Sequence, residues 1–242
     1  MRSDSMIIPA QFRGPIESGN GGYVCGRLAS HLPGCAAVRL KAPPPLETEL
    51  RVQASDSEAQ LLQQSRVIAE AKVAELELSP PARPSFAEAR EAAKSFAGFT
   101  RHPFPQCFVC GPERAAGDGL RIFPGPIGSE PVVAAPWIPD KALANGSGRI
   151  HEEYLWAALD CPGYFAVVPM LESGKAAVLG EMCARMDAAV EPNTNYVVTG
   201  WSLGQEGRKR YAGSAIFSAT GHVVAMAEAT WIEVSGSVSA SE

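Results

Sequence analysis

The sequence lacks the segments that would send the chain out of the cell or into a membrane. The start, Met1–Phe12, has no basic region followed by an apolar stretch, so we expect no secretory signal. The longest apolar segment, Tyr154–Leu171, is interrupted by Asp160 and by a proline and falls short of a membrane span. We therefore expect a soluble, cytoplasmic protein.

Clustered positive charge is also scarce. The 21 Lys and Arg residues are scattered among 26 Asp and Glu residues, which gives a net charge of −5. Nucleic acids and anionic membranes bind to dense basic patches, so we expect neither as a partner. One basic run, 208–210, could meet a phosphate group, but a charged run beside a turn is usually a solvated face. We leave it out of the predicted site.

No disulfide framework is evident. The six cysteines in 242 residues are irregularly spaced, which favours reduced thiols in a core. Cys107 and Cys110 form a C-x-x-C pair, but a zinc site would need two more ligands from His102, Cys161, Cys183 or elsewhere. No paired histidine is evident for Cys161 as a nucleophile, so packing is the preferred interpretation. We expect structural thiols, no metal ion and no cofactor.

A repeated pattern is the strongest feature that the sequence does contain. Val67–Leu78 matches Val223–Val234, and both segments are typical of the last strand of similar units. A helical pattern lies upstream of each, at Gly21–His31 and at His151–Asp160. In the second, Pro162 with the following glycine should break or kink the helix. The pattern predicts one helix in each half of the chain.

Each predicted helix is followed by four strand-like runs joined by short turns. The runs are Ala36–Lys41, Glu47–Ala54, Ala59–Gln64 and Val67–Leu78 in the first half, and Ala176–Val190, Asn195–Leu203, Arg208–Ser218 and His222–Val234 in the second. A helix followed by a strand meander predicts an antiparallel sheet wrapped around one helix, which is an α+β fold. We place the first domain at 1–78, a proline-rich linker with a short helix at 79–104, and the second domain at 105–242. A capping box at Ser85 and Glu88 should begin the linker helix.

Three motifs resemble the hotdog acyl-CoA thioesterase superfamily, of the phenylacetate-pathway and 4-hydroxybenzoyl-CoA thioesterase type. Residues 18–22 look like the approach to its central helix, where a His or Asn precedes a Gly-Gly pair. Residues 107–112 with 119–121 resemble a stretch near the start of many such domains, although residues 113–116 replace the usual Asn-Pro. Residues 155–160 resemble the later part of the helix, which carries a carboxylate. The resemblance implies a tandem double hotdog, with two antiparallel sheets each wrapped around a central helix and joined as a pseudo-dimer.

The resemblance also implies a thioester hydrolase with a composite site. In this superfamily the Gly-Gly pair offers a backbone N–H to the thioester carbonyl, and a carboxylate from the partner unit's helix acts as base or nucleophile. A helix N-terminus has unpaired N–H groups and the positive end of the dipole, so it suits a developing oxyanion. Gly21 and Gly22 would be the donors, and Asp160 would be the carboxylate. The remaining predicted residues share a substrate-binding role: Asn20, Tyr23 and His151.

Spacing predicts that only one such site is complete. In the family the carboxylate lies eight residues after the first glycine of the pair, a position that is Ala29 in the first half. Counting back the same interval from Asp160 reaches Glu152, so His151, Glu152 and Glu153 stand where the glycine element would be. Each half keeps a different part of the machinery, which predicts one site built across the two halves.

Other functions remain open at this stage. An enoyl thioester hydratase or dehydratase would use His151 with an acid, and a non-catalytic acyl-thioester-binding module would keep the fold without the chemistry. Gly19–Gly22 could be only a loop and helix cap, Asp160 could satisfy backbone at a helix end, and His151 could be an exposed cap. The expected partner is an acyl-CoA or related acyl thioester, and further pairing into a homodimer is compatible with this.

Overall fold

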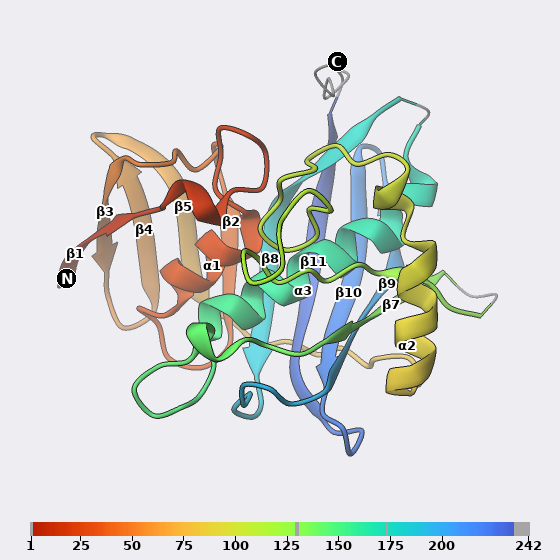
Figure 1. The fold of residues 1–242 in the computed structure, drawn as a ribbon. Coiled ribbons are helices and arrows are strands. Elements are labelled where there is room, and N and C mark those ends of the chain that lie inside the picture. The colour runs from red at the N-terminus through yellow and green to blue at the C-terminus, as the bar shows by residue number, and fades with distance from the viewer. Residues whose placement is uncertain (1, 129–130, 173, 235–242) are drawn as a thin grey trace.

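One antiparallel sheet of 11 strands is the framework of the molecule (Figure 1). The structure, a computed structural model, describes residues 2–128, 131–172 and 174–234. The strands are β1 (Arg2–Ile7), β2 (Ala36–Leu40), β3 (Glu49–Ala54), β4 (Glu58–Gln63), β5 (Arg66–Val73), β6 (Gly125–Pro126), β7 (Val132–Trp137), β8 (Ala176–Met186), β9 (Tyr196–Glu206), β10 (Lys209–Phe217) and β11 (Val223–Val234). Their order across the sheet is β1-β3-β4-β5-β2-β8-β11-β10-β9-β7-β6.

Three α-helices and five short 3-10 turns complete the described elements. The helices are α1 (Gly21–Ala29), α2 (Phe86–Ala92) and α3 (Glu152–Val167), and the turns are η1 (Ala10–Phe12), η2 (Ala93–Ser95), η3 (Ala97–Phe99), η4 (Lys141–Leu143) and η5 (Val168–Met170). In Figure 1, α1 and α3 lie together in front of the middle of the sheet. This central pair is where the two halves of the chain meet.

The two halves share a single sheet because β2 pairs with β8. Their antiparallel register runs from Ala36 opposite Ala184 to Arg39 opposite Glu181. The two antiparallel sheets predicted above, one in each half, are joined in the structure into one continuous sheet. The antiparallel pairing within each half agrees with the predicted meander, since β3-β4-β5 and β9-β10-β11 are each joined in chain order.

The second central helix continues past the residue at which the sequence predicts its end. Pro162 lies inside α3, and the helix extends to Val167. A proline removes one helical hydrogen bond, but every α3 residue from Leu155 onward is buried, so tertiary packing holds the helix together. Gly200 of β9 lies directly against the Pro162 carbonyl, where any side chain would collide with it. The helix is therefore not broken at Pro162, where the sequence predicts a break or a kink.

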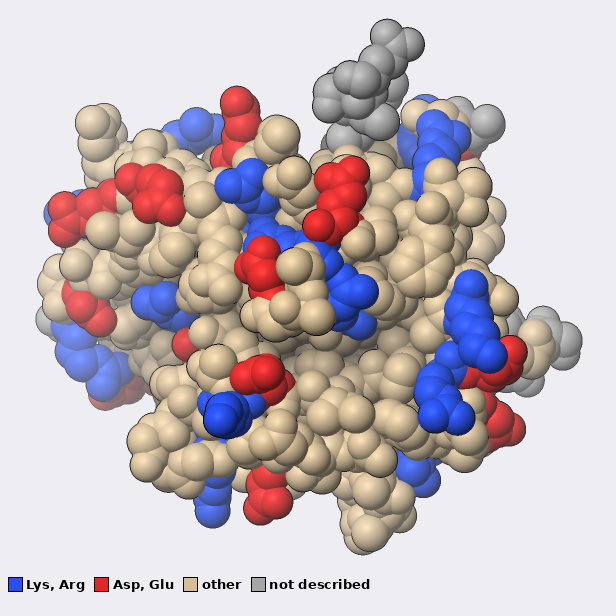
Figure 2. Space-filling view, viewed as in Figure 1, with Lys and Arg blue, Asp and Glu red and all other residues tan. Residues whose placement is uncertain are grey.

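The eight predicted strands are present, and β1, β6 and β7 are additional to them. The linker helix is confirmed as α2: Ser85 accepts from the backbone of Glu88, and the Glu88 side chain accepts in return from the backbone of Ser85. Within the described ranges, no helix is both long and apolar enough to cross a membrane. Acidic and basic side chains are interspersed over the face shown in Figure 2.

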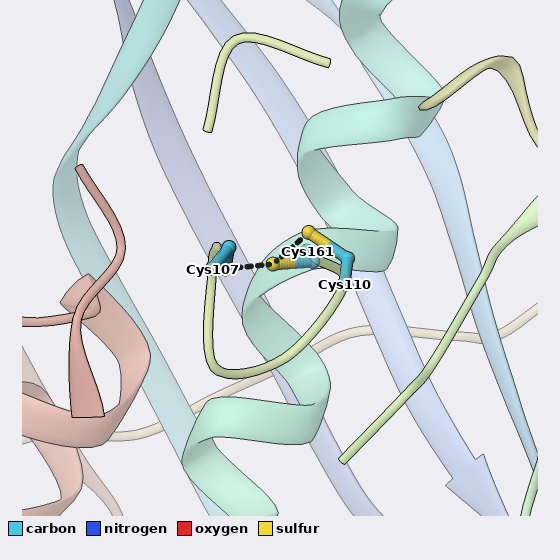
Figure 3. A group of neighbouring side chains, drawn as sticks. All are labelled: Cys107, Cys110 and Cys161. Carbon is cyan, nitrogen blue, oxygen red and sulfur yellow. Dashed lines mark hydrogen bonds between the residues drawn. The ribbon is translucent and has the colours of Figure 1, made fainter. Parts of the chain in front are cut away.

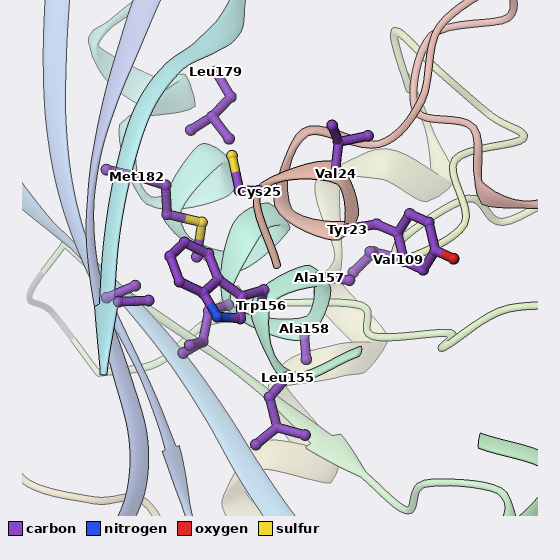
Figure 4. Close-up of a cluster of buried hydrophobic side chains, with 14 of the residues drawn as sticks. Tyr23, Val24, Cys25, Val109, Leu155, Trp156, Ala157, Ala158, Leu179 and Met182 are labelled. Atoms are coloured by element: carbon purple, nitrogen blue, oxygen red, sulfur yellow. The ribbon is translucent and has the colours of Figure 1, made fainter. Parts of the chain in front are cut away.

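The core between α1, α3 and the sheet is made of closely packed apolar side chains (Figure 4). Trp156 of α3 lies beside Cys25 of α1 and faces Leu179 and Met182 of β8 in that view. All four are buried. Because α3 is apolar on all sides along this stretch, it suits a fully enclosed position better than a surface one. The packing fixes the N-terminus of α1 against the middle of α3.

Candidate functional site

Asp160 of α3 and the N-terminus of α1 meet at the centre of the molecule. One carboxylate oxygen of Asp160, Oδ2, accepts hydrogen bonds from Asn20 Nδ2 and from the backbone N–H of Gly22, both at 2.9 Å. Asn20 is the N-cap of α1, and its Oδ1 accepts from the backbone N–H of Tyr23 at 2.9 Å. The structure therefore brings together Asn20, Gly22 and Asp160, which the sequence places in opposite halves.

Two glycines allow α1 and α3 to approach this closely. A side-chain carbon at Gly22 would lie 2.6 Å from both Asp160 Cβ and the Trp156 carbonyl oxygen. One at Gly26, a turn later on the same helix face, would lie 2.7 Å from Glu153 Cα and 2.8 Å from Trp156 Cβ. Atoms at these separations clash, so only glycine fits. Gly22 of the Gly-Gly pair thus permits close helix packing, in addition to providing a backbone N–H at the start of α1.

The Asp160 carboxyl is 3% exposed, and burial raises its pKa from the usual acidic range to about 7. The Gly22 N–H and the Asn20 amide act in the opposite direction because they stabilise the charged form, and nearby Cys107 raises the pKa further. Oδ1, the second oxygen, is buried and has no hydrogen-bond partner among the described residues. This oxygen is available to a bound molecule.

A cavity of about 320 Å³ opens beside Asp160 and is lined mainly by apolar side chains. Its walls come from the approach to α1, the end of β2, the 102–110 loop, α3, β8 and β11. Asn20, Gly21 and Asp160 all line it. Two other lining residues, His102 and Trp231, have buried ring nitrogens, Nε2 and Nε1, with no partner in the described part of the chain. Buried polar atoms are normally paired, so these atoms are consistent with a partly polar ligand.

Three buried thiols lie at the same cavity (Figure 3). Cys161 follows Asp160 on α3; its Sγ lies 3.1 Å from Cys110 Sγ and 3.7 Å from Cys107 Sγ. Burial raises the pKa of the Cys110 and Cys161 thiols well above the usual value. Hydrogen bonds from those two thiols, aided by the backbone N–H groups of Cys110 and Val109, hold the pKa of Cys107 well below it.

Two of the predicted substrate-binding residues lie outside this cavity. The Tyr23 ring stacks on Phe12 with centroids 4.2 Å apart, and its hydroxyl accepts from Arg27 at 3.0 Å. His151 is the N-cap residue of α3, its side chain is 47% exposed, and it makes no capping hydrogen bond. Both belong to the opposite end of the helix crossing, where the N-terminus of α3 meets α1, so their geometry gives them no contact with the cavity.

His102, Trp231 and Tyr164 line the cavity without having been singled out in the sequence as substrate contacts. His102 lies just before the Cys107–Cys110 segment, so that cysteine motif is the sequence feature that points most directly to its role. Trp231 lies within the repeated strand pattern, where it has the appearance of an ordinary core residue. Their convergence depends on how α3, β11 and the 102–110 loop pack together, which local spacing does not reveal.

Solved structures similar to this chain share its architecture over nearly the whole length. A tesB protein of Mycobacterium avium subsp. paratuberculosis is 13% identical with a TM-score of 0.64, covering 96% of this chain and 93% of its own. A protein of unknown function with a hotdog fold from Alicyclobacillus acidocaldarius is 11% identical with a TM-score of 0.66, covering 97% and 94%. A Thermobifida fusca protein provisionally described as a thioesterase II is 15% identical with a TM-score of 0.60, covering 97% and 94%. No protein-family model matches the chain, and no curated protein matches its sequence.

These likenesses show that the chain has the hotdog fold that its motifs predict. The coverage of both partners in each comparison exceeds nine tenths, which is consistent with a tandem double hotdog. At identities of 11–15% the comparisons define the fold, and the chemistry of this chain has to be argued from its own site.

Proposed function

We propose that this chain hydrolyses an acyl thioester of the coenzyme A class at one site shared by its two halves. The observation that carries the proposal is the meeting of Asp160 with the N-terminus of α1 at a mainly apolar cavity. A carboxylate beside a helix N-terminus pairs a base or nucleophile with donors suited to a developing oxyanion. Residues 1–78 and 105–242 would be the two hotdog units of an internal pseudo-dimer, joined by 79–104.

The two glycines would have different tasks in this site. The Gly22 N–H already donates to Asp160 and so positions the carboxylate. The Gly21 N–H makes no hydrogen bond to another described residue, and Gly21 lines the cavity. It is the better placed of the two to donate to the thioester oxygen. One such donor is typically worth roughly 100- to 1,000-fold in rate.

Asp160 would supply the second function through its unpaired oxygen. Oδ1 either attacks the thioester carbonyl carbon or takes a proton from the water that attacks it. The carbon–sulfur bond then breaks, and the products are a free carboxylic acid and a thiol. The apolar walls, including Leu40, Leu179 and Tyr164, would surround the acyl group.

The proposal is tested by Asp160→Asn on a panel of acyl-CoA thioesters, with thiol release followed by a chromogenic reagent. The amide keeps the shape of the carboxylate and loses its basicity, so kcat should fall by roughly 100-fold or more. Binding of a non-hydrolysable thioether analogue should change little. Glu153→Gln is a matched control, since it removes a carboxylate from the same helix outside the cavity. Wild-type turnover by Asp160→Asn would show that the assignment is wrong.

The same panel separates the alternatives. A hydratase would need a histidine at the substrate; His151, the residue that the sequence suggests for this, lies away from the cavity, whereas His102 lines it. Including an enoyl thioester and following loss of its conjugated absorbance measures that activity directly. Tight analogue binding without any turnover of the panel would favour a non-catalytic binding module.

A further inference from the structure

The cluster of Cys107, Cys110 and Cys161 takes no part in the proposed hydrolysis, and it is unusual in its geometry. The three Sγ atoms all lie within 4.8 Å of one another, and all three residues are buried. They come from two segments that are distant in sequence, the 107–110 turn and α3. Figure 3 shows the turn that carries Cys107 and Cys110 lying against the helix that carries Cys161.

The turn that carries Cys107 and Cys110 is tightly specified. The Gly111 N–H donates to the Cys107 carbonyl at 2.9 Å. A side-chain carbon at Gly111 would lie 2.5 Å from that same oxygen and 2.6 Å from the Cys107 nitrogen, so glycine alone fits. The C-x-x-C-G segment therefore holds its two sulfurs on one side of a compact loop. This is an ordered arrangement, in contrast to thiols that fill gaps independently.

The Cys107–Cys161 sulfur separation matches that of a metal thiolate centre, and the Cys110–Cys161 separation is shorter. Two metal–sulfur bonds of about 2.3 Å at a tetrahedral angle place the sulfurs about 3.8 Å apart. The separation between Cys107 and Cys161 is 3.7 Å, and that between Cys110 and Cys161 is 3.1 Å. Only small side-chain adjustments are needed for all three to reach one ion. Cys25, which is equally buried, is absent from the cluster and represents the ordinary packed thiol.

We propose that Cys107, Cys110 and Cys161 bind one thiophilic cation of the Zn²⁺ or Cu⁺ class through three thiolates. Soft sulfur ligands select these ions over the harder Mg²⁺ and Ca²⁺. Each ligand that is still protonated loses its proton to solvent on binding. Because all three cysteines line the cavity beside Asp160, the remaining coordination position faces the cavity.

His102 lines the same cavity and is a candidate for a fourth ligand, but its hydrogen bonding argues against that role. Its Nδ1 accepts from the backbone N–H of Phe104 at 2.9 Å. In a neutral ring the other nitrogen, Nε2, then carries the proton and has no lone pair for a metal. The protein ligand set is therefore three sulfurs. That number suits trigonal Cu⁺, and it suits Zn²⁺ with an exchangeable fourth ligand.

The test is a titration of the reduced full-length chain, freed of metal with a chelator, with Zn²⁺ and separately with Cu⁺. Competition against a chromophoric chelator for each ion gives stoichiometry and affinity, and the two arms distinguish the ions. We expect one ion per chain in at least one arm. Cys161→Ser should weaken binding by more than roughly 100-fold, since loss of a ligand should exceed the loss of an outer-shell partner. Cys183→Ser, a thiol outside the cluster, should bind as the wild type does.

A second measurement does not depend on any variant folding. Wild-type chain with and without the ion is alkylated and its peptides are mapped by mass. The ion should protect Cys107, Cys110 and Cys161, while labelling of Cys35 and Cys183 should be unchanged. The proposal is overturned if neither ion binds stoichiometrically, if Cys183→Ser abolishes binding, or if the reduced chain shows no selective protection.

Discussion

Asn20 does two things with one side chain. Its Oδ1 caps α1, and its Nδ2 donates to the Asp160 carboxylate. Substitutions of Asn20 separate the capping of α1 from the hydrogen bond to Asp160. Serine is as good an N-cap as asparagine, whereas alanine cannot cap and typically costs about 1 kcal/mol. Asn20→Ser and Asn20→Ala should therefore differ by about that free energy of unfolding in a denaturant titration.

Thioester turnover should fall in both Asn20 variants, because both lose the amide that holds Asp160. If the two variants differ strongly in kcat while sharing a substrate-analogue affinity, the positioning role given to the amide is wrong. The difference between the two variants in free energy of unfolding would still measure the contribution of the N-cap alone.

Part of this residue-level arrangement follows from the sequence alone. The family resemblance of the polar cap, the Gly-Gly pair and the spacing to Asp160 predicts that Asn20, Gly22 and Asp160 meet, although their catalytic roles stay a prediction. The thiol cluster was not predictable, because the sequence offered several equivalent third ligands for Cys107 and Cys110. Choosing Cys161 requires knowing that the 107–110 turn lies on α3.

The crossing of α1 and α3 depends on two glycines one turn apart. Gly22→Ala places a methyl group where Asp160 Cβ and the Trp156 carbonyl already lie, so the helices must move apart. Overpacking of this kind costs about 1–3 kcal/mol, and it should also lower turnover by displacing the Gly22 N–H from Asp160. Thermal unfolding and thiol release measure the two effects.

Gly146→Ala is the matched control for Gly22→Ala. Nothing lies within 4 Å of the added carbon there, so neither stability nor turnover should change beyond a few tenths of a kcal/mol. Equal stability of Gly22→Ala and the wild type would mean that the helices do not cross as closely as described.

Helices and strands that depend on local sequence pattern are predicted correctly. Features that depend on tertiary packing are not. The strands of both meanders follow from alternation and turn residues, and α2 follows from its capping box. The continuation of α3 through Pro162 was missed because burial on all sides outweighs one lost hydrogen bond. β1 was missed for a related reason: four of its first five residues are exposed, and its pairing with β3 is the feature that defines it.

At the scale of the whole molecule, the two helix N-termini are not equivalent. That of α1 faces Asp160, whereas the corresponding place opposite α3 would be Ala29 with Glu152 and Glu153 at the helix start. We expect calorimetric titration with a non-hydrolysable thioether analogue to give one binding site per chain. Ala29→Asp should leave the stoichiometry at one, since the two glutamates would repel an oxyanion there. A stoichiometry of two, in either protein, would contradict the composite site.

The pairing of β2 with β8 has a consequence for how the site responds to concentration. When two separate chains build a site between them, dilution separates them and the site is lost. Here both contributions belong to one polypeptide, so their encounter is governed by an effective concentration that the connecting segment sets. The geometry around Asp160 should therefore persist at any dilution at which the chain stays folded, and activity per chain should be independent of how much protein is present.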